Sequence, residues 1–220
     1  MQEKDFDNII SKVVADYLTT NKDVNTDSDV NKVMVGVSNR HIHLSQAHLE
    51  ILFGQGHALT VKSMVGQPGQ YAAEETVTLV GPKGSMNKVR VLGPVRPESQ
   101  VEISTTDSFQ LGIKAPIGES GKISGTPGIL VVGPKGQVEL KEGVMVAWRH
   151  IHLLPEDAAE IGVKDRQIVS VKVDGFRGGF LGNVLIRVSD TSAKEMHIDV
   201  DEANAFGIKN NDKVAIQLGE

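Results

Sequence analysis

The sequence contains no cysteine among its 220 residues. This absence excludes disulfide bonds, catalytic thiolates and cysteine-based zinc sites, so a metal site in this chain would use histidine and carboxylate side chains. Aromatic residues are also scarce, at 4% of the chain, whereas glycine occurs 23 times. That combination is typical of many short strands joined by tight turns rather than of a helix bundle.

Two further features are missing. No apolar run approaches the roughly 20 residues that a membrane-spanning helix needs, and the acidic N-terminus lacks the basic start and apolar core of a secretion signal. We therefore expect an intracellular protein. The net charge of −5 gives no general attraction to nucleic acid or to an anionic membrane, so an anionic ligand would need a local basic cluster.

The N-terminal region combines a helical pattern with a polar stretch. Residues 1–18 place their apolar side chains on one face of a helix. Residues 19–32 are rich in Thr, Asn and Asp and predict a flexible linker. A helix this short needs a surface to pack on. It is either the first helix of the folded domain or a detachable segment that docks on another protein.

The rest of the chain is dominated by short β-type segments. The expected strands are 33–37, 59–65, 76–80, 87–92, 101–104, 129–132, 137–140, 144–148, 168–173, 181–188 and 214–218. Two near-identical Val-Gly-Pro-Lys-Gly segments, 80–84 and 132–136, predict tight turns between antiparallel strands. A Gly-rich segment at 115–128 is either a plain crossover loop or the lining of a substrate cleft. The whole pattern predicts a mainly β protein built from small barrels.

The most informative feature is a pentapeptide that occurs twice. Arg-His-Ile-His-Leu stands at 40–44 and again at 149–153, and the two copies hold four of the seven histidines. Residues i and i+2 of a strand point to the same face, so the two histidines of each copy converge. Two imidazoles on one face can bind one divalent metal ion.

A second repeat begins at the histidines. After His43, His152 and His197 the chain continues with a short helix, a glycine and the next strand. His197 is therefore the natural additional ligand. Five histidines exceed the usual three protein ligands of a catalytic zinc, so two metals are the simpler interpretation. His150 and His152 with His197 would hold one of them.

His41 and His43 with a carboxylate would hold the other metal, and the sequence alone leaves that carboxylate open. The candidates are Glu74, Glu75, Glu98 and Glu102. The two remaining histidines, His48 and His57, lie outside the repeat, and we expect them to be solvated. A basic set near the histidines suggests a phosphate-bearing substrate, because arginine makes forked contacts to phosphate oxygens. Its members are Arg40, Lys88, Arg90, Arg96 and Arg149.

These motifs resemble those of the phosphate propanoyltransferases, the phosphotransacylases of bacterial microcompartments. The resemblance spans about residues 31–218. It rests on Ser38-Asn39-Arg40-His41-Ile42-His43-Leu44-Ser45, on Trp148-Arg149-His150-Ile151-His152-Leu153 and on the segment around His197. It implies two small β-barrel domains, each capped by short helices. Residues 39–148 would form the first domain, and residues 33–38 with 149–220 the second, discontinuous one.

The resemblance also implies the ligands of two divalent metal ions, normally Zn2+, in the cleft between the domains. One metal falls to His41, His43 and Glu102, with the coenzyme A sulfur completing its shell. The other falls to His150, His152 and His197, with waters in its open positions. The phosphate-binding residue falls on Arg96, and contacts to coenzyme A fall on Ser38, Arg90 and Asn204.

The implied reaction transfers a propanoyl or acetyl group between coenzyme A and inorganic phosphate. Packaged members of the family carry an N-terminal encapsulation peptide, and residues 1–18 with the linker 19–32 fit that description. We therefore expect the chain in the microcompartment lumen, with residues 1–18 docking on shell or cargo proteins. We also expect a homo-oligomer, and neither nucleic acid nor membrane as a partner.

The residues favour one mechanism and leave two alternatives open. Because there is no cysteine and no evident Ser–His pair, we expect direct attack by phosphate, oriented by Arg96, without a covalent acyl-enzyme. A metal-dependent hydrolase would use the same histidines with water as nucleophile and would need no phosphate. A non-catalytic metal protein would have closed sites with four protein ligands, whereas five histidines over two metals leave positions open.

Overall fold

The computed structural model describes residues 29–218. The amphipathic helix predicted at 1–18 and the linker as far as residue 28 lie outside the described residues. The C-terminal part of the predicted linker, 29–32, is folded instead, as η1 (Asp29–Asn31) and the start of β1. Asn31 is buried and Lys32 pairs with Ala215, and these contacts fix a segment whose composition predicts flexibility.

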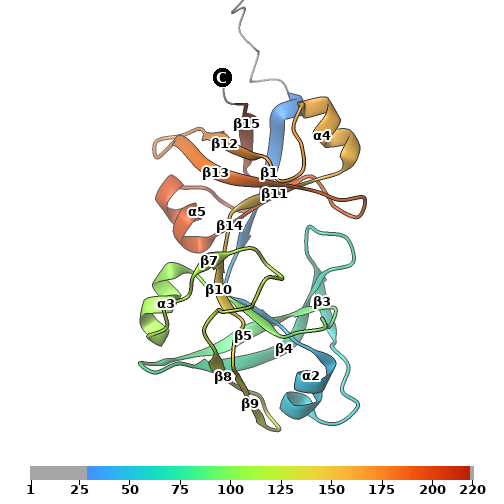
Figure 1. Ribbon diagram of the computed structural model, residues 1–220, viewed down its shortest axis with the longest axis vertical. Helices are drawn as coiled ribbons and strands as arrows, with labels where there is room; N and C mark the ends of the chain where they lie inside the picture. Colours follow the sequence, from blue (N-terminus) through green and yellow to red (C-terminus); the bar gives the residue numbers. More distant parts are fainter. Residues whose placement is uncertain (1–28, 219–220) are drawn as a thin grey trace, which may run out of the picture.

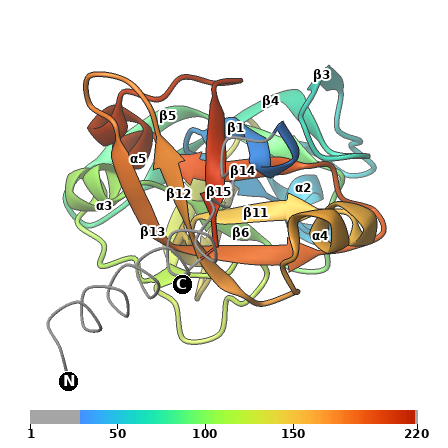
Figure 2. The ribbon, with the colours of Figure 1, turned by 90° about the horizontal axis from the view of Figure 1, so that it is seen from above.

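Six strands close into a barrel in the order β1-β14-β11-β13-β12-β15. They are β1 (Lys32–Ser38), β11 (His150–Leu153), β12 (Ile168–Val173), β13 (Gly179–Val188), β14 (Glu195–Asp199) and β15 (Lys213–Gln217). Figure 2 shows this barrel from above. β1 runs parallel to β14 and antiparallel to β15. The strand before the first histidine pair therefore belongs to the C-terminal sheet.

The remaining strands form a second sheet below the barrel in Figure 1. They are β2 (His41–His43), β3 (Val61–Met64), β4 (Tyr71–Val80), β5 (Ser85–Gly93), β6 (Gln100–Glu102), β7 (Ile117–Gly118), β8 (Ile129–Val132), β9 (Gln137–Leu140) and β10 (Val144–Ala147). Their order is β7-β10-β6-β2-β5-β4-β8-β9, with β3 on β4. The mainly β prediction is confirmed, but this half curls without closing. Its edge strand β9 packs against α2 instead, which protects that edge without closure.

Four short helices connect the strands. They are α2 (Gln46–Phe53), α3 (Thr105–Leu111), α4 (Pro155–Ile161) and α5 (Val200–Phe206). Three of them are the predicted helices that follow a histidine. The sequence interpretation missed α3, although Ser104 and Asp107 form a capping box and Gly112 ends the helix in a left-handed conformation. No helix within residues 29–218 is long and apolar enough to cross a membrane.

The two Gly-Pro-Lys-Gly turns join antiparallel strands as predicted, β4 to β5 and β8 to β9. Each turn also covers the C-terminal end of a helix. The backbone N–H of Lys83 donates to the carbonyl of Leu111 at 3.1 Å, and that of Lys135 donates to the carbonyl of Leu52 at 3.0 Å. These bonds satisfy carbonyls that a helix end leaves unpaired. The turns thereby attach α3 and α2 to the open sheet.

Candidate metal centres and substrate cleft

The first ligand cluster lies where β2 and β6 pair antiparallel. His41 stands opposite Glu102 in this register, and the ligand atoms of His41, His43 and Glu102 lie within 4.8 Å of one another. All three side chains are buried. The Nδ1 atom of His41 lies 2.9 Å from the carbonyl oxygen of Asn39, which accepts its hydrogen bond. The Nε2 atom of His41 faces Glu102 Oε2 at 3.5 Å.

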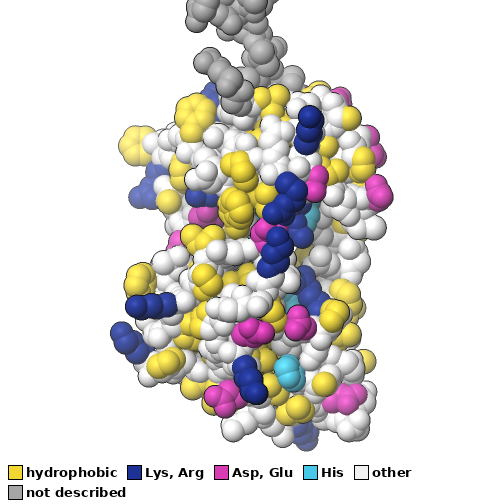
Figure 3. Space-filling model, viewed as in Figure 1, with side chains coloured by type: hydrophobic (Ala, Val, Ile, Leu, Met, Phe, Trp, Pro, Cys, Tyr) yellow, Lys and Arg dark blue, Asp and Glu magenta, His cyan; other side chains and the backbone are white. Residues whose placement is uncertain are grey.

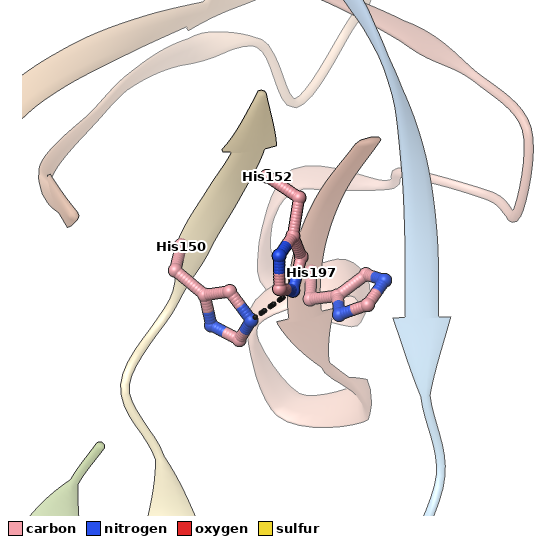
Figure 4. A group of neighbouring side chains, drawn as sticks. All are labelled: His150, His152 and His197. Carbon is pink, nitrogen blue, oxygen red and sulfur yellow. Dashed lines mark hydrogen bonds between the residues drawn. The ribbon is translucent and has the colours of Figure 1, made fainter. Parts of the chain in front are cut away.

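The second cluster repeats this arrangement in the barrel, where β11 pairs antiparallel with β14 and His150 stands opposite His197. The ligand atoms of His150, His152 and His197 lie within 4.8 Å of one another, and Figure 4 shows the three rings converging. The Nε2 atoms of His150 and His152 are 3.1 Å apart. The Nδ1 of His150 lies 2.7 Å from the Trp148 carbonyl, which holds the ring in this orientation.

The protonation of both clusters suits a divalent metal. Burial, followed by the charge of His41, lowers the pKa of His43 to about 3. Burial also lowers the pKa of His150 to about 4, reinforced by His197, and that of His152 to about 2, reinforced by His150. These imidazoles are therefore neutral at pH 7, with lone pairs free for coordination.

Two further observations support the fit of a metal at the first cluster. Burial alone would raise the pKa of Glu102, but the neighbouring His41 and His43 bring it to about 2, so the carboxylate is ionised. The Nδ1 atom of His43 is buried without a hydrogen-bond partner among the described residues, an expensive arrangement unless a ligand occupies the site. Two imidazoles with an ionised carboxylate form a donor set that Zn2+ commonly takes.

The two clusters are structural counterparts, and Glu102 takes the place that His197 has in the barrel. In all four ligand-bearing strands, the residue two positions after the ligand is the N-cap of a short helix. These ligand and N-cap pairs are His43 and Ser45, Glu102 and Ser104, His152 and Leu154, and His197 and Asp199. The repeat thus has four copies rather than three. The sequence interpretation missed the fourth because a glutamate replaces the histidine.

The arginines of the repeated pentapeptide have a structural role in this fold. Arg40 makes an ion pair with Asp107 at 2.8 Å, and Arg149 makes one with Glu202 at 3.3 Å. Both acids are members of helix capping boxes, in α3 and α5. Both arginines are thus paired with carboxylates, and their part in a phosphate-binding cluster stays a prediction. Lys88 is exposed and has no part in either cluster.

Arg96 lies beside the first cluster. Its guanidinium is 3.4 Å from the Ser120 hydroxyl, and Ser120 also accepts a hydrogen bond from Gln100 at 3.0 Å. Gln100 in turn donates to Glu102 at 2.6 Å. Ser120 belongs to the Gly-rich segment 115–128, so this segment contacts residues beside the first cluster.

The residues predicted to contact coenzyme A are only partly brought together. Ser38 lines a cavity that also contains His41 and Glu102 of the first cluster and His150 and His197 of the second. Arg90 stands beside His41 on β5, but its Nη1 donates to the backbone carbonyls of Ala73 and Glu74. Asn204 is exposed on α5 and does not line this cavity.

A second, larger cavity of about 410 Å³ opens beside one histidine of the second cluster. Its lining includes His152, Arg187, Arg166 and Glu119. In Figure 3, Lys and Arg side chains gather over the middle of the face shown, beside a histidine. Arg187, which stands beside His152 in the pairing of β11 with β13, was missed by the sequence interpretation. The only sequence signal for Arg187 is its place as a charged residue in an otherwise apolar part of the expected strand 181–188.

The histidines outside the repeat are not ligands in either cluster, as predicted, but they are less solvated than expected. The Nδ1 of His48 lies 2.7 Å from the Ser99 hydroxyl, and the Nε2 of His57 lies 2.9 Å from Glu75. Among the other candidate carboxylates, Glu74 pairs with Lys62, and Glu98 is exposed. Only Glu102 joins a histidine cluster in the described part of the chain.

The closed barrel and the curled sheet carry matched histidine clusters beside a common cavity. A family profile that matches most of the chain shows that the protein is an enzyme of the acyltransferase class. The chain belongs to the phosphate propanoyltransferase family, whose profile matches residues 34–209.

Several similar proteins are phosphate propanoyltransferases, and they match most of this chain. The phosphate propanoyltransferase of Rhodobacter capsulatus is 53% identical over 209 residues, which cover 95% of this chain and 97% of that protein. The phosphate propanoyltransferase of Thermotoga maritima is 55% identical, over 84% of this chain and 88% of its own. That of Salmonella typhimurium is 54% identical, over 85% and 89% respectively.

Proposed function

We propose that this enzyme transfers a short acyl group, propanoyl or acetyl, between coenzyme A and inorganic phosphate, with one Zn2+ at each histidine cluster. The observation that carries the proposal is the shared cavity. It places His41 and Glu102 of one cluster beside His150 and His197 of the other. A reacting group that enters this cavity would lie beside residues of both clusters. When bound, divalent metals would stabilise a thiolate and polarise a carbonyl oxygen.

Two arginines fit the binding of phosphate. Neither Arg96 nor Arg187 has a carboxylate within ion-pair distance among residues 29–218. Burial lowers the pKa of Arg96, Glu102 opposes this effect, and the positive charge of Arg187 adds to it. Two half-buried positive charges repel unless an anion lies between them. A phosphate bound by both would satisfy their donors in forked contacts.

The transfer balances without a covalent enzyme intermediate. A phosphate oxygen attacks the thioester carbonyl carbon, the C–O bond forms, and the C–S bond breaks. Coenzyme A leaves as a thiolate that takes up a proton from solvent. Arg96 and Arg187 would hold phosphate against the thioester and offset its charge. The absence of cysteine removes one nucleophile that an acyl-enzyme would require.

The test is phosphate-dependent release of coenzyme A from propanoyl-CoA. His41→Ala and Arg96→Ala should each reduce kcat/KM, by about 100-fold or more for loss of a charge-stabilising group. His57→Ala provides the matched control, because His57 pairs with a carboxylate outside both clusters. Full activity in either cluster variant would contradict the assigned role. Turnover without phosphate would instead support the metal-dependent hydrolase.

We propose in addition that Ser38, Arg90 and Asn204 contact coenzyme A.

We also propose that residues 1–18 act as an encapsulation peptide that carries the enzyme into the microcompartment lumen. The helical spacing of apolar residues in 1–18 and the polar composition of 19–28 support this proposal. A fluorescent protein fused to residues 1–28 should enter shells. Diffuse fluorescence throughout the cytoplasm would contradict it.

A further inference from the structure

The second cluster has a carboxylate neighbour that the proposed reaction does not use. Glu195 lies on β14 two residues before His197, so both side chains are on the same face of the strand. Its Oε2 atom is 2.9 Å from His197 Nε2, and its backbone stands opposite His152. The carboxylate is not part of the group of ligand atoms formed by the three histidines. It therefore contacts one ligand from outside the cluster.

The orientation of His197 determines which nitrogen is left for a metal. Figure 4 shows one ring nitrogen on the side of His150 and His152 and the other pointing away from them. A neutral imidazole carries one proton, and an ionised carboxylate can only accept a hydrogen bond. The Nε2 of His197 must then hold the proton that it donates to Glu195. This leaves the Nδ1 lone pair directed into the cluster.

Glu195 is held by groups from both halves of the molecule. Gln67 is buried in the loop between β3 and β4 of the open sheet, and its amide donates to Glu195 Oε2 at 3.0 Å. The same amide exchanges two hydrogen bonds with the backbone of Ala193, both at 3.2 Å. The loop of one sheet is thereby fixed to the start of β14 in the other, directly over Glu195.

Two glycines make room for this carboxylate. A Cβ atom at Gly36 would lie 2.8 Å from Glu195 Oε1, and a Cβ at Gly66 would overlap both carboxylate oxygens. Gly66 belongs to the same loop as Gln67, and Gly36 lies beside His197 on the neighbouring strand β1. The carboxylate of Glu195 therefore occupies space that a side chain at either glycine would fill.

We propose that Glu195 is a positioning residue that fixes the tautomer and ring orientation of His197 so that Nδ1 binds the second metal. The β3–β4 loop, through Gln67 and Gly66, keeps the carboxylate in place. This inference rests on the proposed metal binding. His41 and His150 obtain the same constraint from backbone carbonyls, whereas His197 uses a charged partner. Partners of this kind raise the basicity of the ligand as well as orienting it.

The test measures metal affinity in the full-length, metal-stripped protein, by titration with Zn2+ against a chromophoric chelator. The wild type should bind two equivalents. Glu195→Ala should weaken one equivalent about 10- to 100-fold and leave the other unchanged. Glu195→Gln keeps an oxygen acceptor without the charge and should therefore lower the Zn2+ affinity less than Glu195→Ala does. Gly66→Ala should weaken the same equivalent, because the added methyl group displaces the carboxylate without removing it.

Glu75→Ala is the matched control, since Glu75 is a buried carboxylate that also contacts a histidine Nε2 at 2.9 Å, away from the clusters. It should leave both affinities unchanged. Wild-type affinity for both equivalents in Glu195→Gln and Gly66→Ala would overturn the positioning role, even if Glu195→Ala fails to fold. Failure of the wild type to bind a second equivalent would instead refute the proposed metal site.

Discussion

At the scale of single residues, the arginines near the histidines divide into two kinds. Arg40 and Arg149 are neutralised by acids of neighbouring helix caps. Arg96 and Arg187 have no such partner in the described part of the chain, although both are half-buried. A desolvated guanidinium without a counter-ion is unfavourable. The protein retains two of them near the histidine clusters, as expected where a bound anion supplies the missing charge.

Replacing Arg187 tests whether this residue binds the phosphate substrate. Arg187→Gln should raise the KM for phosphate about 10- to 100-fold, the loss expected for a hydrogen bond to a charged group. The KM for propanoyl-CoA should change little, because the substitution leaves both histidine clusters intact. Steady-state kinetics with each substrate varied in turn measures the two constants. The exposed Lys62, which pairs with Glu74, provides the control as Lys62→Gln. An unchanged KM for phosphate would exclude Arg187 from the anion site.

At the scale of elements, the unit that repeats is a strand with a ligand, an N-cap two residues later, a short helix and a glycine. The capping residue and the terminal glycine recur because a helix of two turns has little stability of its own and depends on its ends. In the open sheet, α2 and α3 gain a further contact from a Gly-Pro-Lys-Gly turn. Each of these two helices is thus attached at its start to a strand that carries a ligand and at its end to a turn between two other strands.

The turn that covers α2 gives a prediction for stability. A Cβ at Gly133 would lie 2.5 Å from the carbonyl oxygen of Leu52, a backbone atom that cannot move freely. Gly133→Ala should therefore reduce the free energy of unfolding by about 1–3 kcal/mol, the usual cost of overpacking. Gly118→Ala has open space around its Cβ and should be close to neutral. Urea denaturation of both variants compares them, and equal midpoints would contradict the role of the turn.

At the scale of the whole molecule, the buried histidines make the stability of the metal-free protein depend on pH. The folded-state pKa values of His43, His150 and His152 are about 3, 4 and 2, below the value of about 6.5 in an unfolded chain. As the pH falls, the unfolded chain binds protons first. The stability contribution is therefore fully present above about pH 6.5 and is lost progressively below it.

Urea denaturation of the metal-stripped protein at about pH 7.5 and about pH 5 should show a lower midpoint at the acid pH. His152→Gln removes one of the three groups, so the difference between the two midpoints should become smaller. A midpoint that does not depend on pH in the metal-free wild type would show that the unfolded chain gains no protons relative to the folded one.

Much of this arrangement could be predicted from local sequence signals. Strands such as 129–132, 137–140 and 168–173 have the predicted bounds, because period-two patterns and turn residues are local. The convergence of each histidine pair also follows from strand geometry. The choice of Glu102 required a resemblance to known proteins, since its place opposite His41 depends on pairing between distant strands. Arg187 and Glu195 could not be identified, because ordinary strand residues acquire their roles only through the fold.

The exchange of histidine for glutamate at position 102 has an electrostatic consequence. The two halves present matched ligand geometries, but the first triad includes a carboxylate, whereas in the barrel the carboxylate of Glu195 contacts His197 from outside the ligand set. The same divalent ion would therefore have an anionic ligand in the open sheet and only imidazole ligands from the protein in the barrel. The Lewis acidity of two chemically identical ions would therefore differ. The duplicated fold thus provides two metal sites with different ligands, and an anionic substrate would bind between them in one preferred orientation.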